Sequence, residues 1–98
     1  MTPAAFKRTL SNAAPPRDVD ASLQGLWWAK KGDWEKAHRT VMGAHSPEAA
    51  WVHAYLHRVE GEIDNARYWY RQARQRVADG SLEDEWENIA KALLARVG

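Results

Sequence analysis

The chain contains no cysteine, so it can form neither a disulfide framework nor a thiolate metal site. It also lacks any apolar run near the roughly 18 residues of a membrane span, and its N-terminus has no hydrophobic signal core. Fourteen basic side chains face thirteen acidic ones, whereas a dedicated nucleic-acid binder carries a larger basic excess. The sequence therefore predicts a soluble cytoplasmic protein that binds neither membranes nor nucleic acids.

β-Branched residues are sparse and strict apolar–polar alternation is absent, so strands are disfavoured. Apolar residues instead recur at three- and four-residue spacing, and every proline falls outside the interiors of the helices that this spacing defines. The pattern predicts an all-α fold in which residues 1–19 are an N-terminal segment with a Pro-rich linker and residues 20–98 are one helical domain. We expect helices at 20–31, 33–42, 47–60 and 62–78, a last helix opening at 81–84, and a short helix within 1–12.

Two short stretches share one order of residues: glycine, acid, apolar residue, two polar residues, alanine. They are GDWEKA at 32–37 and GEIDNA at 61–66, and each lies between two predicted helices. This order resembles the tetratricopeptide repeat, a helical hairpin with small and aromatic residues at fixed places. The resemblance covers roughly residues 20–78 and implies two stacked hairpins. We expect the last helix to cap them through Trp86, Ile89, Leu93 and Leu94.

The sequence departs from that family in its period, because the two glycines are 29 residues apart instead of about 34. The proline that closes each family repeat is also missing. Residues 53–73 resemble, in addition, a segment of small uncharacterised bacterial proteins, which implies no activity.

The tetratricopeptide resemblance implies a concave surface lined by the first helix of each hairpin. Lys30, Trp51, Tyr55 and Arg58 fall at such positions, and tryptophan, tyrosine and arginine are typical of binding hot spots. We therefore expect a small helical interaction module for an unknown protein or peptide partner. The alternative is that the N-terminal segment, or a second copy in a homodimer, covers this surface.

His53 and His57 lie one helical turn apart, with Glu60 three residues further on the same face. Histidines at this spacing can share a zinc ion, but the general base of a zincin motif is replaced by Ala54. We expect partly buried histidines bonded to Tyr70 or to a carbonyl, with no metal and no cofactor. The sequence leaves enzymatic activity open and favours a non-enzyme. The alternative is a ligand- or metal-binding protein, conceivably an enzyme, centred on His53, His57 and Glu60.

Overall fold

The computed structural model describes residues 1–97. These residues form six α-helices and one short 3-10 helix, joined by loops. No strand occurs in this range, so the predicted all-α fold class is confirmed. None of the helices in residues 1–97 has both the length and the apolar character needed to cross a membrane. In chain order the elements are α1 (Pro3–Arg8), η1 (Thr9–Ser11), α2 (Ala21–Lys30), α3 (Trp34–Met42), α4 (Pro47–Val59), α5 (Ile63–Ala73) and α6 (Leu82–Val97).

Side-chain caps fix the predicted helix starts. The Ser46 hydroxyl accepts a hydrogen bond from the Ala49 amide at 3.1 Å, directly before Pro47 at the first position of α4. Ser81 does the same for the Asp84 amide at 3.0 Å and starts α6. These caps agree with the apolar spacing, which is why most boundaries were predictable to within one or two residues.

The end of α5 differs from the prediction of a helix reaching residue 78. The helix ends at Ala73, and Arg74 adopts the left-handed conformation with φ 58°. The Arg74 amide donates to the Arg71 carbonyl and the Gln75 amide donates to the Tyr70 carbonyl, the paired bonds of a Schellman motif. Glycine usually occupies this position, so an arginine there gave no signal in the sequence.

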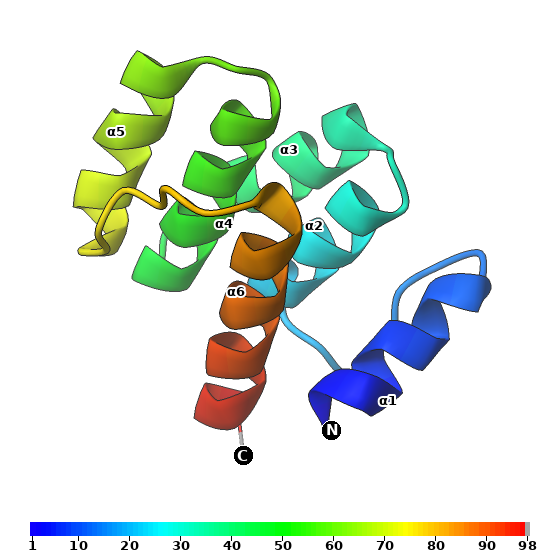
Figure 1. Cartoon of the computed structure of the whole chain (residues 1–98). Helices are drawn as coiled ribbons and strands as arrows, with labels where there is room; N and C mark the ends of the chain where they lie inside the picture. Colours follow the sequence, from blue (N-terminus) through cyan, green and yellow to red (C-terminus); the bar gives the residue numbers. More distant parts are fainter. Residues whose placement is uncertain (98) are drawn as a thin grey trace.

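The helices form two hairpins, α2–α3 and α4–α5, and α3 packs against α4. Helix α6 crosses in front of α2 and α4 and contacts both, while α1 packs against α6 (Figure 1). The last helix therefore lies over the first helix of each hairpin. The tetratricopeptide-like arrangement itself remains a prediction.

The core lies where α6 meets the two hairpins. Trp27, Trp86 and Leu26 are fully buried there, and the Trp86 indole N–H donates to the Leu26 carbonyl at 2.8 Å. Beside them the buried Glu85 carboxylate accepts hydrogen bonds from the Arg58 guanidinium, at 2.8 Å, and from the Tyr70 hydroxyl. Burial of apolar surface and this polar network together hold α6 in place.

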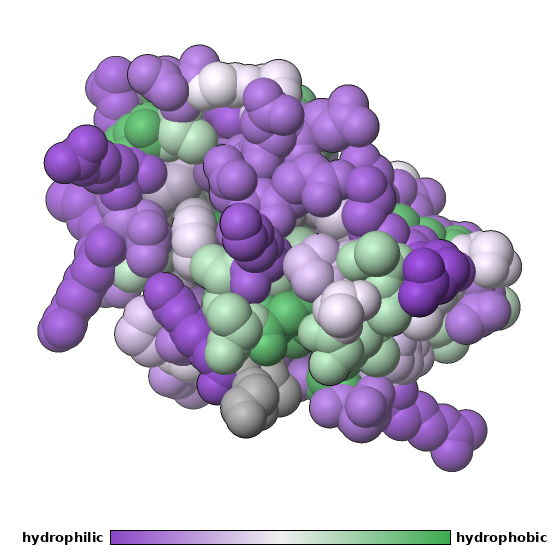
Figure 2. All heavy atoms as spheres, turned by 60° about the horizontal axis from the view of Figure 1, so that its bottom comes forward, coloured by the Kyte–Doolittle hydropathy of each residue, from purple (hydrophilic) through white to green (hydrophobic). Residues whose placement is uncertain are grey.

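The surface seen from below the view of Figure 1 is mostly polar (Figure 2). Apolar side chains gather mainly in one band across the middle of this face, and a smaller apolar group lies at the upper left (Figure 2). More than half of a typical protein surface is apolar, so the band alone assigns no function.

Candidate metal centre

Three histidines from two neighbouring helices meet at one place. His38 lies on α3, and His53 and His57 lie one turn apart on α4. One ring nitrogen from each lies within 4.8 Å of the other two, and the Nε2 atoms of His38 and His53 are 3.0 Å apart. The packing of α3 against α4 therefore produces a cluster of three imidazoles.

Glu62 contacts the outer side of this cluster because of the turn between α4 and α5. Gly61 adopts φ 78°, which returns the chain over the last turn of α4, and the Glu62 amide donates to the His57 carbonyl at 2.9 Å. The Glu62 carboxylate lies 3.1 Å from Nδ1 of His57. The carboxylate thus fixes this ring with Nδ1 protonated and leaves Nε2 as the free nitrogen.

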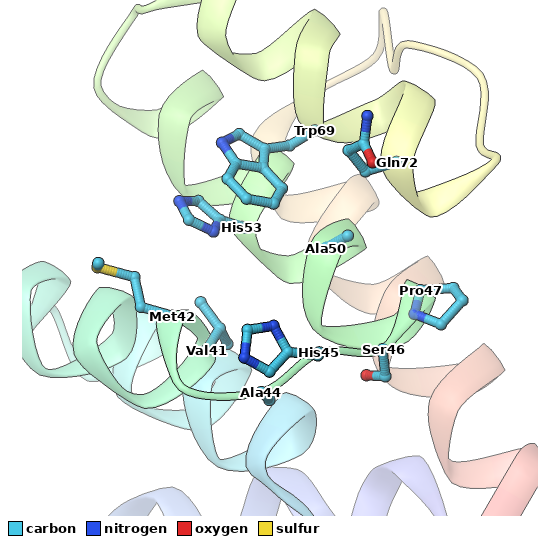
Figure 3. Close-up of a pocket in the computed structure, with 10 residues that line it drawn as sticks. All are labelled: Val41, Met42, Ala44, His45, Ser46, Pro47, Ala50, His53, Trp69 and Gln72. Atoms are coloured by element: carbon cyan, nitrogen blue, oxygen red, sulfur yellow. The ribbon is translucent and has the colours of Figure 1, made fainter.

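Two indoles hold the other rings. Trp69 of α5 stacks on His53 at 3.9 Å between ring centroids, and Trp34 stacks on His38 at 4.7 Å. The Trp34 indole N–H donates to the Leu56 carbonyl at 2.8 Å, so this indole is itself fixed. In Figure 3 the His53 ring lies beside the Trp69 indole, on the wall of a cavity of about 400 Å³. The imidazoles are therefore oriented by aromatic stacking as well as by hydrogen bonds.

Two of the three rings are held neutral by their surroundings. Burial, followed by the nearby His38 and His57, lowers the pKa of His53 to about 4. Burial and then His57 also lower the pKa of His38, while the Glu62 carboxylate acts in the opposite direction. Neutral imidazole is the form that binds metal ions, so both rings are in the binding form at neutral pH.

The ring nitrogens of the three histidines could bind one transition-metal ion after small movements of the imidazoles. Zn–N bonds of about 2.0–2.1 Å place the nitrogens of a tetrahedral site roughly 3.3–3.4 Å apart. The observed 3.0 Å between His38 and His53 is a hydrogen bond between neutral rings, and the third nitrogen lies within 4.8 Å. A metal ion would open the first contact by a few tenths of an ångström and draw His57 inward. The ring that donates in this contact would carry its proton on Nδ1 instead, which frees both Nε2 lone pairs for the ion. A nitrogen-only donor set suits Zn²⁺, Cu²⁺ or Ni²⁺ rather than Mg²⁺ or Ca²⁺.

Comparison with known proteins gave no match. No family model, no curated protein and no solved structure is similar to this chain. The tetratricopeptide-like and bacterial resemblances therefore remain predictions. Any statement about function has to come from the residues themselves.

The structure places the predicted concave-surface residues largely under α6. Tyr55 is 7% exposed, and Arg58 is paired with Glu85 of α6. The Lys30 ammonium lies 5.2 Å from the centre of the Trp86 ring, which also belongs to α6. The partly buried Trp51 lies under the Arg96 guanidinium at 5.7 Å. The chain's own last helix thus covers much of the surface that the resemblance assigned to a partner.

The histidine prediction was incomplete in three respects. His38 was missed, because its contact with His53 depends on how α3 packs against α4, although its place four residues after Trp34 marks the same helix face. Glu60 lies exposed at the end of α4, and Glu62 contacts His57 instead. Tyr70 was expected beside the histidines, but its hydroxyl donates to Glu85.

Proposed function

We propose that this protein binds a divalent transition-metal ion, with Zn²⁺ the reference case, through His38, His53 and His57. The observation that carries the proposal is the meeting of three imidazole nitrogens within 4.8 Å, from two helices. Two of these histidines were the centre of the alternative function expected from the sequence, and the third completes a ligand set of the size found in catalytic zinc sites.

The surroundings of the cluster support this function. The Glu62 carboxylate on His57 gives the carboxylate–histidine–metal arrangement that orients ligands in known metal sites. Stacking on Trp34 and Trp69 limits the movement of the other two rings. A ligand set that is already gathered and oriented loses less conformational entropy when the ion binds.

The interaction module expected from the sequence ranks second. A partner would need another surface, because α6 lies over Tyr55 and Arg58. The apolar band of Figure 2 is one candidate, and a second copy of the chain is one candidate occupant. The cytoplasmic location also stays a proposal.

A thermal melt with and without Zn²⁺ at pH 7.5 tests metal binding. Zinc at about 100 times its dissociation constant should stabilise the fold by about 2.7 kcal/mol, which corresponds to roughly 10–20 °C in Tm for a domain of this size. The shift should disappear in His38→Ala and in His57→Ala, whose side chains are only partly buried. It should also shrink as the pH falls, because protons compete with the metal ion for the imidazoles.

His45→Ala is the matched control. His45 is the fourth histidine of the chain and is exposed; it lines the cavity of Figure 3 together with His53 but lies outside the three-histidine cluster. This variant should keep the full zinc shift. A parent protein whose Tm does not change with zinc, or whose shift is lost equally in His45→Ala, would show that the cluster is only a packing arrangement.

A further inference from the structure

We infer that a metal ion in this site keeps its fourth position free of protein ligands and takes an exchangeable small anion or water there. This inference rests on the proposed metal function and names the class of small ligand that the bound ion would take. A metal site with an open position can accept ligands, whereas a closed site with four protein ligands only stabilises the fold. The donors around the cluster, the access to the cluster and its charge all favour such an open position.

The first step is the set of donors. Among residues 1–97, the cluster itself offers three nitrogens, one from each histidine. Its nearest walls are Trp34 and Trp69, and an indole N–H is a donor without a lone pair for a metal. The Glu62 carboxylate is held on the far nitrogen of His57, and its side chain is 50% exposed. Three ligands therefore come from the cluster, and tetrahedral Zn²⁺ or Co²⁺ needs one more.

The second step is access. His38 and His57 are only partly buried, so solvent contacts both side chains. The cavity of Figure 3 has His53 in its wall. Water and small anions can therefore reach the cluster without unfolding.

The third step is charge. Three neutral imidazoles leave the full double positive charge on the ion, and Glu62 offsets part of it from outside the ligand shell. A positive centre with a free position favours an anionic donor such as azide, thiocyanate or hydroxide. The ligand class is therefore a small anion with one donor atom, in exchange with water.

Two side chains in the cavity wall compete for the fourth position, His45 and Met42, and the His45→Ala and Met42→Leu variants below test them. Met42 lies four residues after His38, on the same face of α3, it is 56% exposed, and it shares the cavity wall with His53 (Figure 3). A thioether is a soft ligand that favours Cu(I) over Zn²⁺ or Co²⁺. With Co²⁺ we therefore expect Met42 to stay unbound.

Visible absorption of the Co²⁺-loaded protein tests this inference. Co²⁺ bound by three imidazoles gives bands that change when a ligand in the fourth position is exchanged. Azide should shift these bands in a saturable way, and it should do so equally in the parent, in Met42→Leu and in His45→Ala. Changes in Met42→Leu or in His45→Ala before azide is added would overturn the inference and assign the fourth position to the thioether or to the His45 imidazole.

The outcomes distinguish this inference from the proposed function. Protein that binds Co²⁺ through the cluster, with bands that azide does not move, would overturn the open position and leave the metal function standing. Protein that shows no bound-cobalt bands, or shows the same bands in His38→Ala, would overturn the metal function itself. Saturable azide shifts that are lost in His38→Ala together with the cobalt bands are the expected result.

Discussion

Without metal, the fold should lose stability as the pH falls from 7.5 to 5, and His53 should account for a defined part of this loss. Its pKa is about 4 in the folded protein and about 6.5 in an unfolded chain. The unfolded chain therefore binds more protons between these values, and stability present above pH 6.5 disappears as the pH drops toward 4. The whole shift corresponds to about 3 kcal/mol, of which about 2 kcal/mol should be lost by pH 5.

The groups that face His53 also contribute to the pH dependence. His38, whose pKa is also lowered, adds a loss in the same direction. The Glu62 carboxylate acts in the opposite direction on His38. A comparison with a variant that cannot titrate at position 53 isolates the contribution of that ring.

Urea denaturation followed by circular dichroism, with a chelator present, is the suitable assay. The free energy of unfolding is measured at pH 7.5 and pH 5 for the parent and for His53→Gln, which keeps a hydrogen-bonding side chain. The parent should lose about 2 kcal/mol more than the variant over this interval. Equal losses in the two proteins would refute the claim that His53 is buried in its neutral form.

Three further changes test how α6 is held on the hairpins. Glu85→Ala should cost about 3 kcal/mol in urea denaturation, because the half-buried Arg58 guanidinium keeps only the Gly80 carbonyl and the buried Tyr70 hydroxyl loses its carboxylate acceptor. A loss under about 1 kcal/mol would show that this network is exposed in solution. Tyr55→Ala should also cost about 3–5 kcal/mol, because this large aromatic residue is only 7% exposed. A near-neutral effect on the free energy of unfolding would show that Tyr55 lies on the surface. Truncation after Gly80 removes α6 and should abolish cooperative thermal unfolding, so a truncated chain that melts sharply near the parent's Tm would contradict the fold.

The helices were predictable from the sequence because local signals agreed with each other. Ser46 before Pro47, and Gly61 between two apolar periods, mark boundaries through caps and backbone conformation that depend on neighbouring residues alone. The end of α5 was not predictable in this way, because Arg74 adopts a conformation that sequences usually assign to glycine.

The candidate site was only half predictable. The pairing of His53 with His57 follows from helical spacing, but the entry of His38 depends on the angle and register at which α3 meets α4. The covering of Tyr55 by α6 is likewise a contact between residues far apart in the chain. Single-sequence patterns carry little information about such contacts, so the predicted concave surface and the predicted ligand set were each incomplete.

The most direct test of metal binding through the cluster is ¹⁵N NMR of the four imidazoles during a zinc titration at pH 7.5. Each ring reports on its own nitrogens, and His45 serves as an internal control outside the cluster. We predict that the signals of His38, His53 and His57 change together and saturate at one zinc ion per chain, while those of His45 stay constant. Signals that do not change, or four rings that change in parallel without saturation, would contradict the account.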